Sequence, residues 1–328
     1  MILNDDVRAS RLPITRAGLT LVEVAVVIAI IGILIAILIP AIQSALEASR
    51  RVQCAANLRQ LGLAVNQYQG VCGVFSAGNN NRGYSFILMI LPYLEQKPLY
   101  DSFNFSAAAS MLPPSPNDTA VHVTLGLLHC PSDPRSLAIP GSTCYAGNKG
   151  AGFCAGGPNG TCDNGVFIAP QSSPIGNQSI SDGASSTAMI AEWVVTPAHL
   201  AKINPRWLTY SVARHLVAPD QFDLFVAECH NASAAQAAPA MGKGGEWFRG
   251  TYPETLYNHV EVPNDHSCLN GGSYVQQGAW TAGSLHPQGA NILFVDGHCG
   301  FVRGSVAAKV WRALGTRNGA EVISANTF

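Results

Sequence analysis

A histidine and a carboxylate near the carboxyl end have residue types that suit chemistry. His286 is followed, after nine intervening residues, by Asp296-Gly297. Histidine and a carboxylate can act as a general base and its orienting acid, or as metal ligands. Further polar groups for such a site come from three residues: Asp182, Glu192 and His298.

The spacing of this motif argues against direct contact between its two ends. Ten residues of extended chain span roughly 30 Å, so His286 and Asp296 meet only if the chain folds back. Asp296-Gly297 lies between two apolar runs, which predicts a two-residue hairpin turn with both central residues at positive φ. We therefore expect a turn at Asp296-Gly297 and a capping or packing role for His286.

A second candidate is a single carboxylate inside an apolar segment. Residues 19–39 read LTLVEVAVVIAIIGILIAILI, in which Glu23 is the only ionisable side chain. An unpaired carboxylate in lipid costs about 3 kcal/mol. If the chain is cut between Gly18 and Leu19, the new α-amino group of a neighbouring copy supplies a cation at the matching depth. Glu23 would then be a contact between subunits.

The third candidate group is a set of cysteines. The chain has nine of them, and an exported domain permits up to four disulfides with one thiol left over. Sequence does not fix the connectivity. We favour Cys154 with Cys162, across a Gly-rich loop that closes easily, and Cys229 with Cys268. The alternative is that several cysteines are small buried apolar side chains.

The cysteine and histidine spacings do not indicate a metal site. No C-x-x-C pair and no zinc-finger histidine spacing is present. Calcium prefers six to eight oxygens, whereas the loops 159–164 and 263–266 supply one carboxylate each. We therefore expect no metal ion and no cofactor.

The segment that carries Glu23 has the dimensions of a membrane-spanning helix. Its 21 residues would span about 31 Å, close to the thickness of a hydrocarbon core. Arg8, Arg11 and Arg16 precede it, which favours a cytoplasmic amino terminus. No A-x-A cleavage site follows, so an ordinary secretory signal is a poor match and an uncleaved anchor is the simpler alternative.

Beyond the apolar segment the helix is expected to continue. Pro40 should kink it rather than end it, because helix-forming residues resume at once and follow three- and four-residue apolar spacing. Gly70 and Gly73 indicate the end. The sequence therefore predicts one helix over 19–70, with 19–39 in the membrane and an amphipathic outer half.

The composition of the chain predicts that the remaining residues, 71–328, form an extracytoplasmic β-rich domain of short elements and turns. The chain of 328 residues contains 32 Gly and 20 Pro. We expect strands at 121–128 and 187–195. Only 12% of residues are charged and the net charge is −1, which argues against nucleic-acid binding. No G-x-S-x-G or H-E-x-x-H motif indicates a hydrolase, and we expect no enzyme.

Residues 18–40 resemble the processing site and first helix of type IV prepilins and type II secretion pseudopilins. The resemblance rests on Gly18-Leu19-Thr20-Leu21-Val22-Glu23, the apolar run and Pro40. It implies that residues 1–18 are a leader, that a prepilin peptidase cuts after Gly18, and that Leu19 is methylated. It also implies that Glu23 contacts another subunit. The family usually has Phe or Met where this chain has Leu19.

The rest of the chain resembles the prepilin-type processing-associated family of unknown function, which occurs in bacterial pilin-like proteins. His286 with Asp296-Gly297 matches its motif, and blocks such as LHCPSDP and ISDGASSTAMIAE occur in family order. This resemblance indicates kinship without assigning an activity.

Together these features predict a pilin-like α+β protein: a long first helix packed on an antiparallel sheet, with an enlarged loop-rich head. The expected function is assembly, with other copies or related subunits, into a pilus or secretion pseudopilus at the cytoplasmic membrane. The alternative is a singly anchored recognition module that binds a glycan or protein through exposed tryptophans. Five tryptophans in a domain of this size are more often core.

Overall fold

The computed structural model confirms the α+β class and divides the chain into two compact units, Met1–Leu46 and Glu47–Phe328. It describes the following residues: 20–110, 115–152, 163–169, 173–196, 208–216, 218–238, 242–271 and 274–321.

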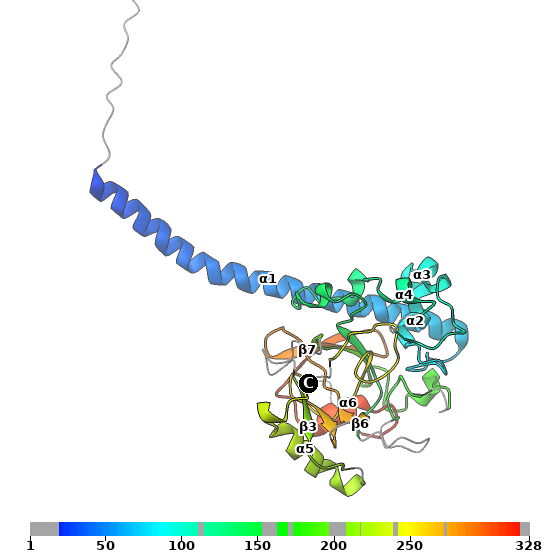
Figure 1. Cartoon of the computed structure of the whole chain (residues 1–328). Helices are drawn as coiled ribbons and strands as arrows, with labels where there is room; N and C mark the ends of the chain where they lie inside the picture. Colours follow the sequence, from blue (N-terminus) through cyan, green and yellow to red (C-terminus); the bar gives the residue numbers. More distant parts are fainter. Residues whose placement is uncertain are drawn as a thin grey trace, which may run out of the picture. The chain divides into compact units, whose positions relative to one another are not determined.

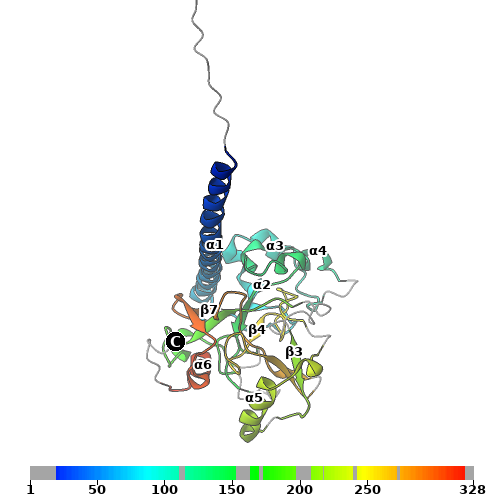
Figure 2. The same cartoon turned by 90° about the vertical axis from the view of Figure 1, so that its left-hand side faces the viewer.

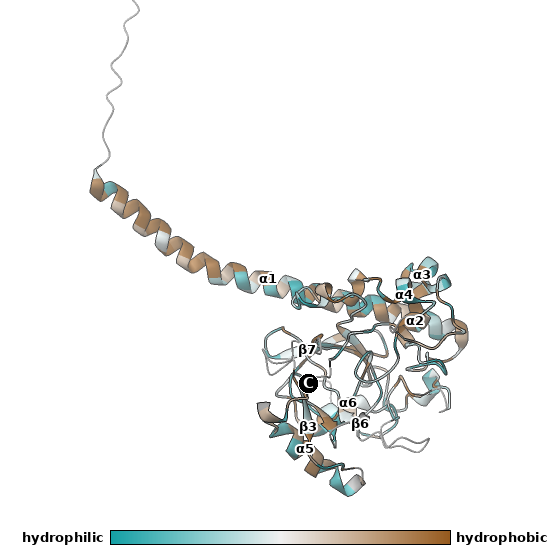
Figure 3. Cartoon of the chain, in the orientation of Figure 1, coloured by the Kyte–Doolittle hydropathy of each residue, from teal (hydrophilic) through white to brown (hydrophobic). Residues whose placement is uncertain are grey.

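The first unit contains the apolar half of helix α1, which runs over Leu21–Cys72 without a break at Pro40. The large apolar side chains between Leu21 and Ile39 are 46% to 85% exposed. Figure 1 shows α1, and Figure 3 shows that its amino-terminal half is mostly hydrophobic. Ser44 Oγ donates a hydrogen bond of 2.9 Å to the Pro40 carbonyl. By length and composition this helix can cross a membrane.

The second unit begins within the same helix, where α1 becomes one side of a core. Its buried face repeats at helical spacing, with Cys54, Leu58, Leu61, Gly62, Ala64 and Val65. The helix ends as predicted, because Gly73 has φ +76° and its N–H bonds the Gln69 carbonyl at 2.8 Å.

The buried face of α1 packs on a five-stranded sheet of order β4-β1-β2-β7-β8, called the central sheet below. The strands are β1 (Tyr145–Asn148), β2 (Ala188–Glu192), β4 (Leu256–Tyr257), β7 (Gly289–Phe294) and β8 (Cys299–Arg303). The expected strand at 187–195 is thus β2. The expected antiparallel pairing holds for β1 with β2, β2 with β7 and β7 with β8, whereas β4 adds a parallel pair with β1 at one edge, so the sheet is mixed.

The two faces of this sheet are covered by different helices (Figure 2). Leu293 of β7 and the following Val295 join the core that contains α1, whereas Ile292 and Phe294 join Trp311 and Leu314 of α6 (Ala308–Gly315). Burial on both faces explains why residues 292–295 read ILFV, a continuous apolar run rather than an alternating one.

A smaller sheet of order β3-β5-β6 forms the second β layer. Its strands are β3 (Thr209–Val212), β5 (Ser267–Asn270) and β6 (Tyr274–Ala279), and β3 pairs with β5 in parallel. Helix α5 (Phe222–His230) packs beside it through Phe225 and Cys229. The predicted Cys229–Cys268 disulfide joins α5 to β5.

Short helices fill the connections. They are α2 (Phe86–Ile90), η1 (Leu91–Leu94), α3 (Lys97–Asp101), α4 (Asp118–Val121), η2 (Gly126–Leu128), η3 (Ser136–Ala138), η4 (Asn177–Ser179), η6 (Pro219–Gln221) and η7 (Ala234–Gln236). The predicted strand at 121–128 is wrong, because α4 and η2 occupy it. The Val121 N–H bonds the Asn117 carbonyl at 3.0 Å and the Leu128 N–H bonds the Leu125 carbonyl at 2.9 Å, which are local turn bonds rather than a ladder.

The close approach of α1 to β7 gives a stability prediction. A Cβ on Gly62 would lie 2.7 Å from Leu293 Cδ2, whereas nothing lies within 4 Å of a Cβ on Gly70. We expect Gly62→Leu to lower the free energy of unfolding by about 1–3 kcal/mol through overpacking. Gly70→Leu is the matched control and should be neutral or stabilising, because Leu favours a helix more than Gly does. Urea unfolding of the full chain in detergent measures both, and equal effects would contradict close packing at Gly62.

Candidate functional site

The motif residue His286 lies in the connection between β6 and β7, fully buried. Its backbone is held locally: the His286 N–H donates to Ser284 Oγ at 3.1 Å, and Ser284 Oγ donates to the Gly289 carbonyl at 2.7 Å. This local loop orients the imidazole toward the helix and the sheet at once.

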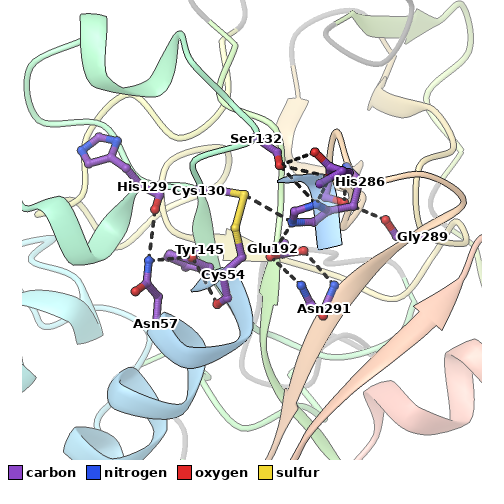
Figure 4. A network of polar contacts seen from close by, with 12 residues as sticks. Cys54, Asn57, His129, Cys130, Ser132, Tyr145, Glu192, His286, Gly289 and Asn291 are labelled. Carbon is purple, nitrogen blue, oxygen red and sulfur yellow. Dashed lines mark hydrogen bonds and ion pairs between the residues drawn. A yellow bond between two sulfur atoms is a disulfide. The ribbon is translucent and has the colours of Figure 1, made fainter. Parts of the chain in front are cut away.

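Two carboxylates contact the imidazole of His286, and Figure 4 shows one of them, Glu192, beside the ring. Nδ1 lies 2.5 Å from Glu47 Oε1, and Glu47 belongs to α1. Nε2 lies 3.6 Å from Glu192 Oε1, at the end of β2. The histidine therefore links the first helix to the central sheet.

Uncharged side chains and backbone groups also donate hydrogen bonds to both carboxylates. Asn291 donates to Glu192 through its backbone N–H (2.8 Å) and its side-chain amide (2.9 Å). Ser132 Oγ lies 3.1 Å from each oxygen of Glu47. These hydrogen bonds offset part of the cost of burying charge.

A disulfide closes the same site. Cys54 of α1 is bonded to Cys130, and Cys130 Sγ lies 3.4 Å from His286 Nε2. Cys54 follows Glu47 by seven residues, two helical turns, so both project from one face of α1. A covalent and an ionic link thus join α1 to the same part of the second unit.

The two carboxylates set the charge state of the histidine. Burial by itself lowers the pKa of His286, but the hydrogen bonds and charges of Glu192 and Glu47 together outweigh it and raise the pKa above 6.5. The imidazolium is therefore favoured up to a higher pH than in a free histidine, with one carboxylate at each nitrogen.

This geometry suits a structural link better than catalysis. A general base needs a free nitrogen to accept the proton of its nucleophile, whereas Nδ1, the nitrogen that faces Ser132 Oγ at 3.3 Å, already contacts Glu47 at 2.5 Å. Side-chain atoms of Cys54, Cys130, Glu192 and His286 lie close enough together to suggest a metal site. The disulfide, however, occupies both sulfurs, so no thiolate is available there.

The other end of the motif forms the predicted turn in a different geometry. The Gly297 N–H bonds the Phe294 carbonyl and the Phe294 N–H bonds the His298 carbonyl, each at 2.9 Å, which closes a three-residue loop. Gly297 has φ +89°, but Asp296 is not at positive φ, so the expected two-residue turn is wrong. Asp296 Oδ1 accepts the His298 N–H at 3.0 Å and also contacts His298 Nδ1 at 2.7 Å.

Both ends of the motif contact α1. His286 meets Glu47, and Asn66 Nδ2 donates to the Val295 carbonyl at 3.4 Å. Residues 47 and 66 are about 28 Å apart along a helix, so the two contacts lie about five turns apart on α1.

Glu23 lies in the first turn of α1, at the other end of the helix. Its Oε2 accepts the Thr20 N–H at 2.8 Å and the Thr20 hydroxyl at 2.9 Å, and the Glu23 N–H donates to Thr20 Oγ1 at 3.3 Å. This reciprocal pattern is a capping box. Glu23 therefore has a role within its own helix that the sequence analysis did not anticipate.

The remaining predicted residues are those of the processing site, Pro40, the cysteines and the tryptophans. Gly18, Leu19, Cys154 and Cys162 lie outside the described residues. Pro40 lies inside α1, and Cys229 is joined to Cys268. Four tryptophans of the described part are at most 2% exposed: Trp193, Trp247, Trp280 and Trp311. These four therefore offer no face on which a glycan could stack.

The sequence analysis missed the partners of His286 other than Glu192. Glu47 and Ser132 were not singled out, and the Cys54–Cys130 pair was not proposed. Some signal was present, because Glu192 ends the ISDGASSTAMIAE block while Cys130 and Ser132 lie within LHCPSDP. What no block reveals is that these segments meet one histidine.

Comparison with protein families matches residues 43–309 to SBP_bac_10, described as a protein of unknown function (DUF1559). The match begins four residues before Glu47 and includes His286 and Asp296-Gly297. No curated protein and no solved structure matches the chain.

The buried charges predict a pH-dependent contribution to stability. Because the folded pKa of His286 exceeds 6.5, its stabilisation is fully present below about pH 6.5 and is lost as pH rises through the folded pKa. We expect His286→Gln to lower the free energy of unfolding by about 3–5 kcal/mol near pH 6, since the buried Glu192 loses its cation and the half-buried Glu47 keeps, among the described residues, only Arg50, at 3.7 Å. The difference from the parent chain should shrink toward pH 9.

Urea unfolding of the full chain in detergent between pH 5 and 9 measures this difference. His298→Gln is the matched control, because its imidazole also contacts a carboxylate, at 2.7 Å, but is 44% exposed. It should change stability by less than about 1 kcal/mol at every pH. A His286→Gln deficit that stays constant with pH would contradict an ionic role.

Proposed function

The chain belongs to the DUF1559 family, and on that basis we propose that it is a pilin-like structural subunit. In this proposal a prepilin peptidase cuts after Gly18 and Leu19 is methylated. The subunit then assembles through its first helix, with other copies or related subunits, into a pilus or secretion pseudopilus. Its body lies outside the cytoplasmic membrane, and no enzymatic activity or nucleic-acid partner is included.

The observation that carries this proposal is the division of one unbroken helix between two environments. From Leu21 to Ile39, α1 is apolar on all sides and its large side chains are exposed. From Cys54 to Val65 the same helix is an integral part of a folded core. A simple anchor does not require the helix to continue into the core, whereas a filament subunit does, because packing of the apolar part must position the folded part.

The apolar half also supplies the energy of association. Each large apolar side chain that is fully buried contributes about 1.5–3 kcal/mol. Once the helices are extracted from the bilayer, they can remove these side chains from water only by packing against one another. Association is therefore the expected fate of this segment outside lipid.

In this proposal Glu23 sets the register between neighbouring subunits. Both contacts of its carboxylate with Thr20 involve Oε2. We assign Oε1 to the methylated α-amino group of a neighbouring copy, which would lie at about the same depth. The carboxylate can then cap its own helix and neutralise a neighbour's charge together.

The support for processing and the support for kinship come from different residues. The family match covers 43–309, which includes the outer part of α1 and most of the second unit. Cleavage, methylation and filament assembly rest on the pattern of residues 18–40.

Two variants separate the charge of Glu23 from its capping role. Glu23→Gln keeps a side chain that can complete a capping box but removes the charge, so it should reduce filament incorporation by at least about tenfold while membrane insertion persists. Thr20→Val removes the cap and keeps the charge, and should assemble nearly normally. Immunoblotting of sheared surface fractions against membrane fractions measures both.

The reverse result has an equally definite meaning. If Glu23→Gln assembles and Thr20→Val does not, Glu23 acts only within its own helix, and the intersubunit contact is rejected.

Processing is tested by mass spectrometry of the native amino terminus. Purification from the source membrane should yield a chain that begins at a methylated Leu19. The same protein from cells without the prepilin peptidase is the control and should begin upstream of Gly18. A chain that retains residues 1–18 in peptidase-containing cells would reject the pilin proposal.

A further inference from the structure

A second cluster of metal-ligating side chains lies in the second unit, away from His286. His230, Glu261 and Asp265 each place one potential ligand atom within 4.8 Å of the other two. His230 Nδ1 lies 2.9 Å from Asp265 Oδ2. Around a tetrahedral ion with bonds of 2.0–2.2 Å, ligand atoms lie about 3.3 Å apart, so only small side-chain movements would close the set.

The fold fixes the backbone at two of these positions. His230 is the last residue of α5 and follows Cys229, which is bonded to Cys268. Asp265 lies three residues before Cys268, and its Oδ1 accepts the His266 N–H at 2.7 Å. The disulfide therefore holds the histidine and the carboxylate together without a metal.

Glu261 supplies an independent indication that a ligand is bound. The residue is only 5% exposed, and its Oε1 is buried with no hydrogen-bond partner. Nδ1 of the adjacent His266 is also buried without a hydrogen bond, 3.5 Å from Asp265 Oδ1. A buried carboxylate oxygen without a partner is costly and uncommon, and a bound cation removes that cost.

The charge balance of the site also favours a cation. Arg312 directs its own contacts elsewhere, to the Val260 carbonyl at 3.3 Å and to Asp223 at 3.8 Å. Among the described residues, no lysine or arginine lies within ion-pair distance of Glu261 or Asp265, and Asp265 contacts only the imidazoles of His230 and His266 in this way.

We propose that His230, Glu261 and Asp265 bind a divalent transition-metal ion of the zinc type. An imidazole with two carboxylates matches zinc and its neighbours, whereas calcium and magnesium prefer oxygen ligands alone. Three protein ligands leave a fourth position for water or another ligand, and the exposed side of His230 is open to it. The expectation of no metal, drawn from spacing alone, considered only the single carboxylate of loop 263–266.

The ion would connect the end of α5 to the segment that precedes β5. These two elements are already joined by Cys229–Cys268. The metal would therefore reinforce this part of the unit, and the inference does not depend on pilus assembly.

The test is titration of the full chain in detergent with Zn²⁺ and with Co²⁺ as a spectroscopic probe. The parent chain carries Cys72→Ser to remove an exposed thiol. We expect one site per chain, a metal-dependent rise in Tm, and Co²⁺ d–d bands without a sulfur-to-cobalt charge-transfer band. Asp265→Asn and Glu261→Gln should each weaken binding by more than about tenfold, the loss typical even of outer-shell partners.

The controls keep this test decisive. His298→Ala removes a histidine that also contacts a carboxylate, Asp296, and should bind metal like the parent. Glu261→Gln keeps the shape of the side chain, so the Tm of the metal-free variant should be at least that of the metal-free parent, and its loss of binding cannot then be attributed to unfolding. The proposal would be overturned if the parent did not bind the metal, or if Asp265→Asn and Glu261→Gln bound it as tightly as the parent does. A thiolate charge-transfer band would also overturn it.

Discussion

The second unit depends on a buried ionic contact in which the imidazole of His286 lies between Glu47 of the first helix and Glu192 of the central sheet. Charges in a protein interior are tolerated only when they are paired and hydrogen-bonded. Asn291 and Ser132 supply those hydrogen bonds. The contact therefore constrains helix, sheet and the loop of Ser132 together, and its partial loss would leave an uncompensated charge.

This constraint explains how one helix serves two environments. The apolar half of α1 has few specific contacts within the chain, and its side chains are exposed. The outer half is held by an ionic contact at Glu47, a disulfide at Cys54 and close packing of Gly62 on Leu293. These three contacts fix the outer half of α1 within the second unit.

Buried polar groups in this unit also differ in whether their atoms have hydrogen-bond or ionic partners. Glu192 receives two hydrogen bonds from Asn291 and faces a histidine, so its charge is balanced. Glu261 has a buried oxygen with no partner, next to a second carboxylate. Both are buried glutamates, yet only the second invites a cation. The distinction lies in the neighbours, because burial penalises every charge and only specific contacts restore it.

The sequence by itself determined the long first helix, its end at Gly73, strand β2 and the turn position at Asp296-Gly297, since local periodicity and glycine conformation dictate these features. It did not determine the mixed pairing of β1 with β4 or the short helices at 118–128, because strand neighbours and local turns there depend on packing between distant segments. The contact of His286 with Glu47, 239 residues away, was likewise decided by tertiary structure alone. Residue types reveal which groups can carry charge, but only the fold brings opposite charges out of water together.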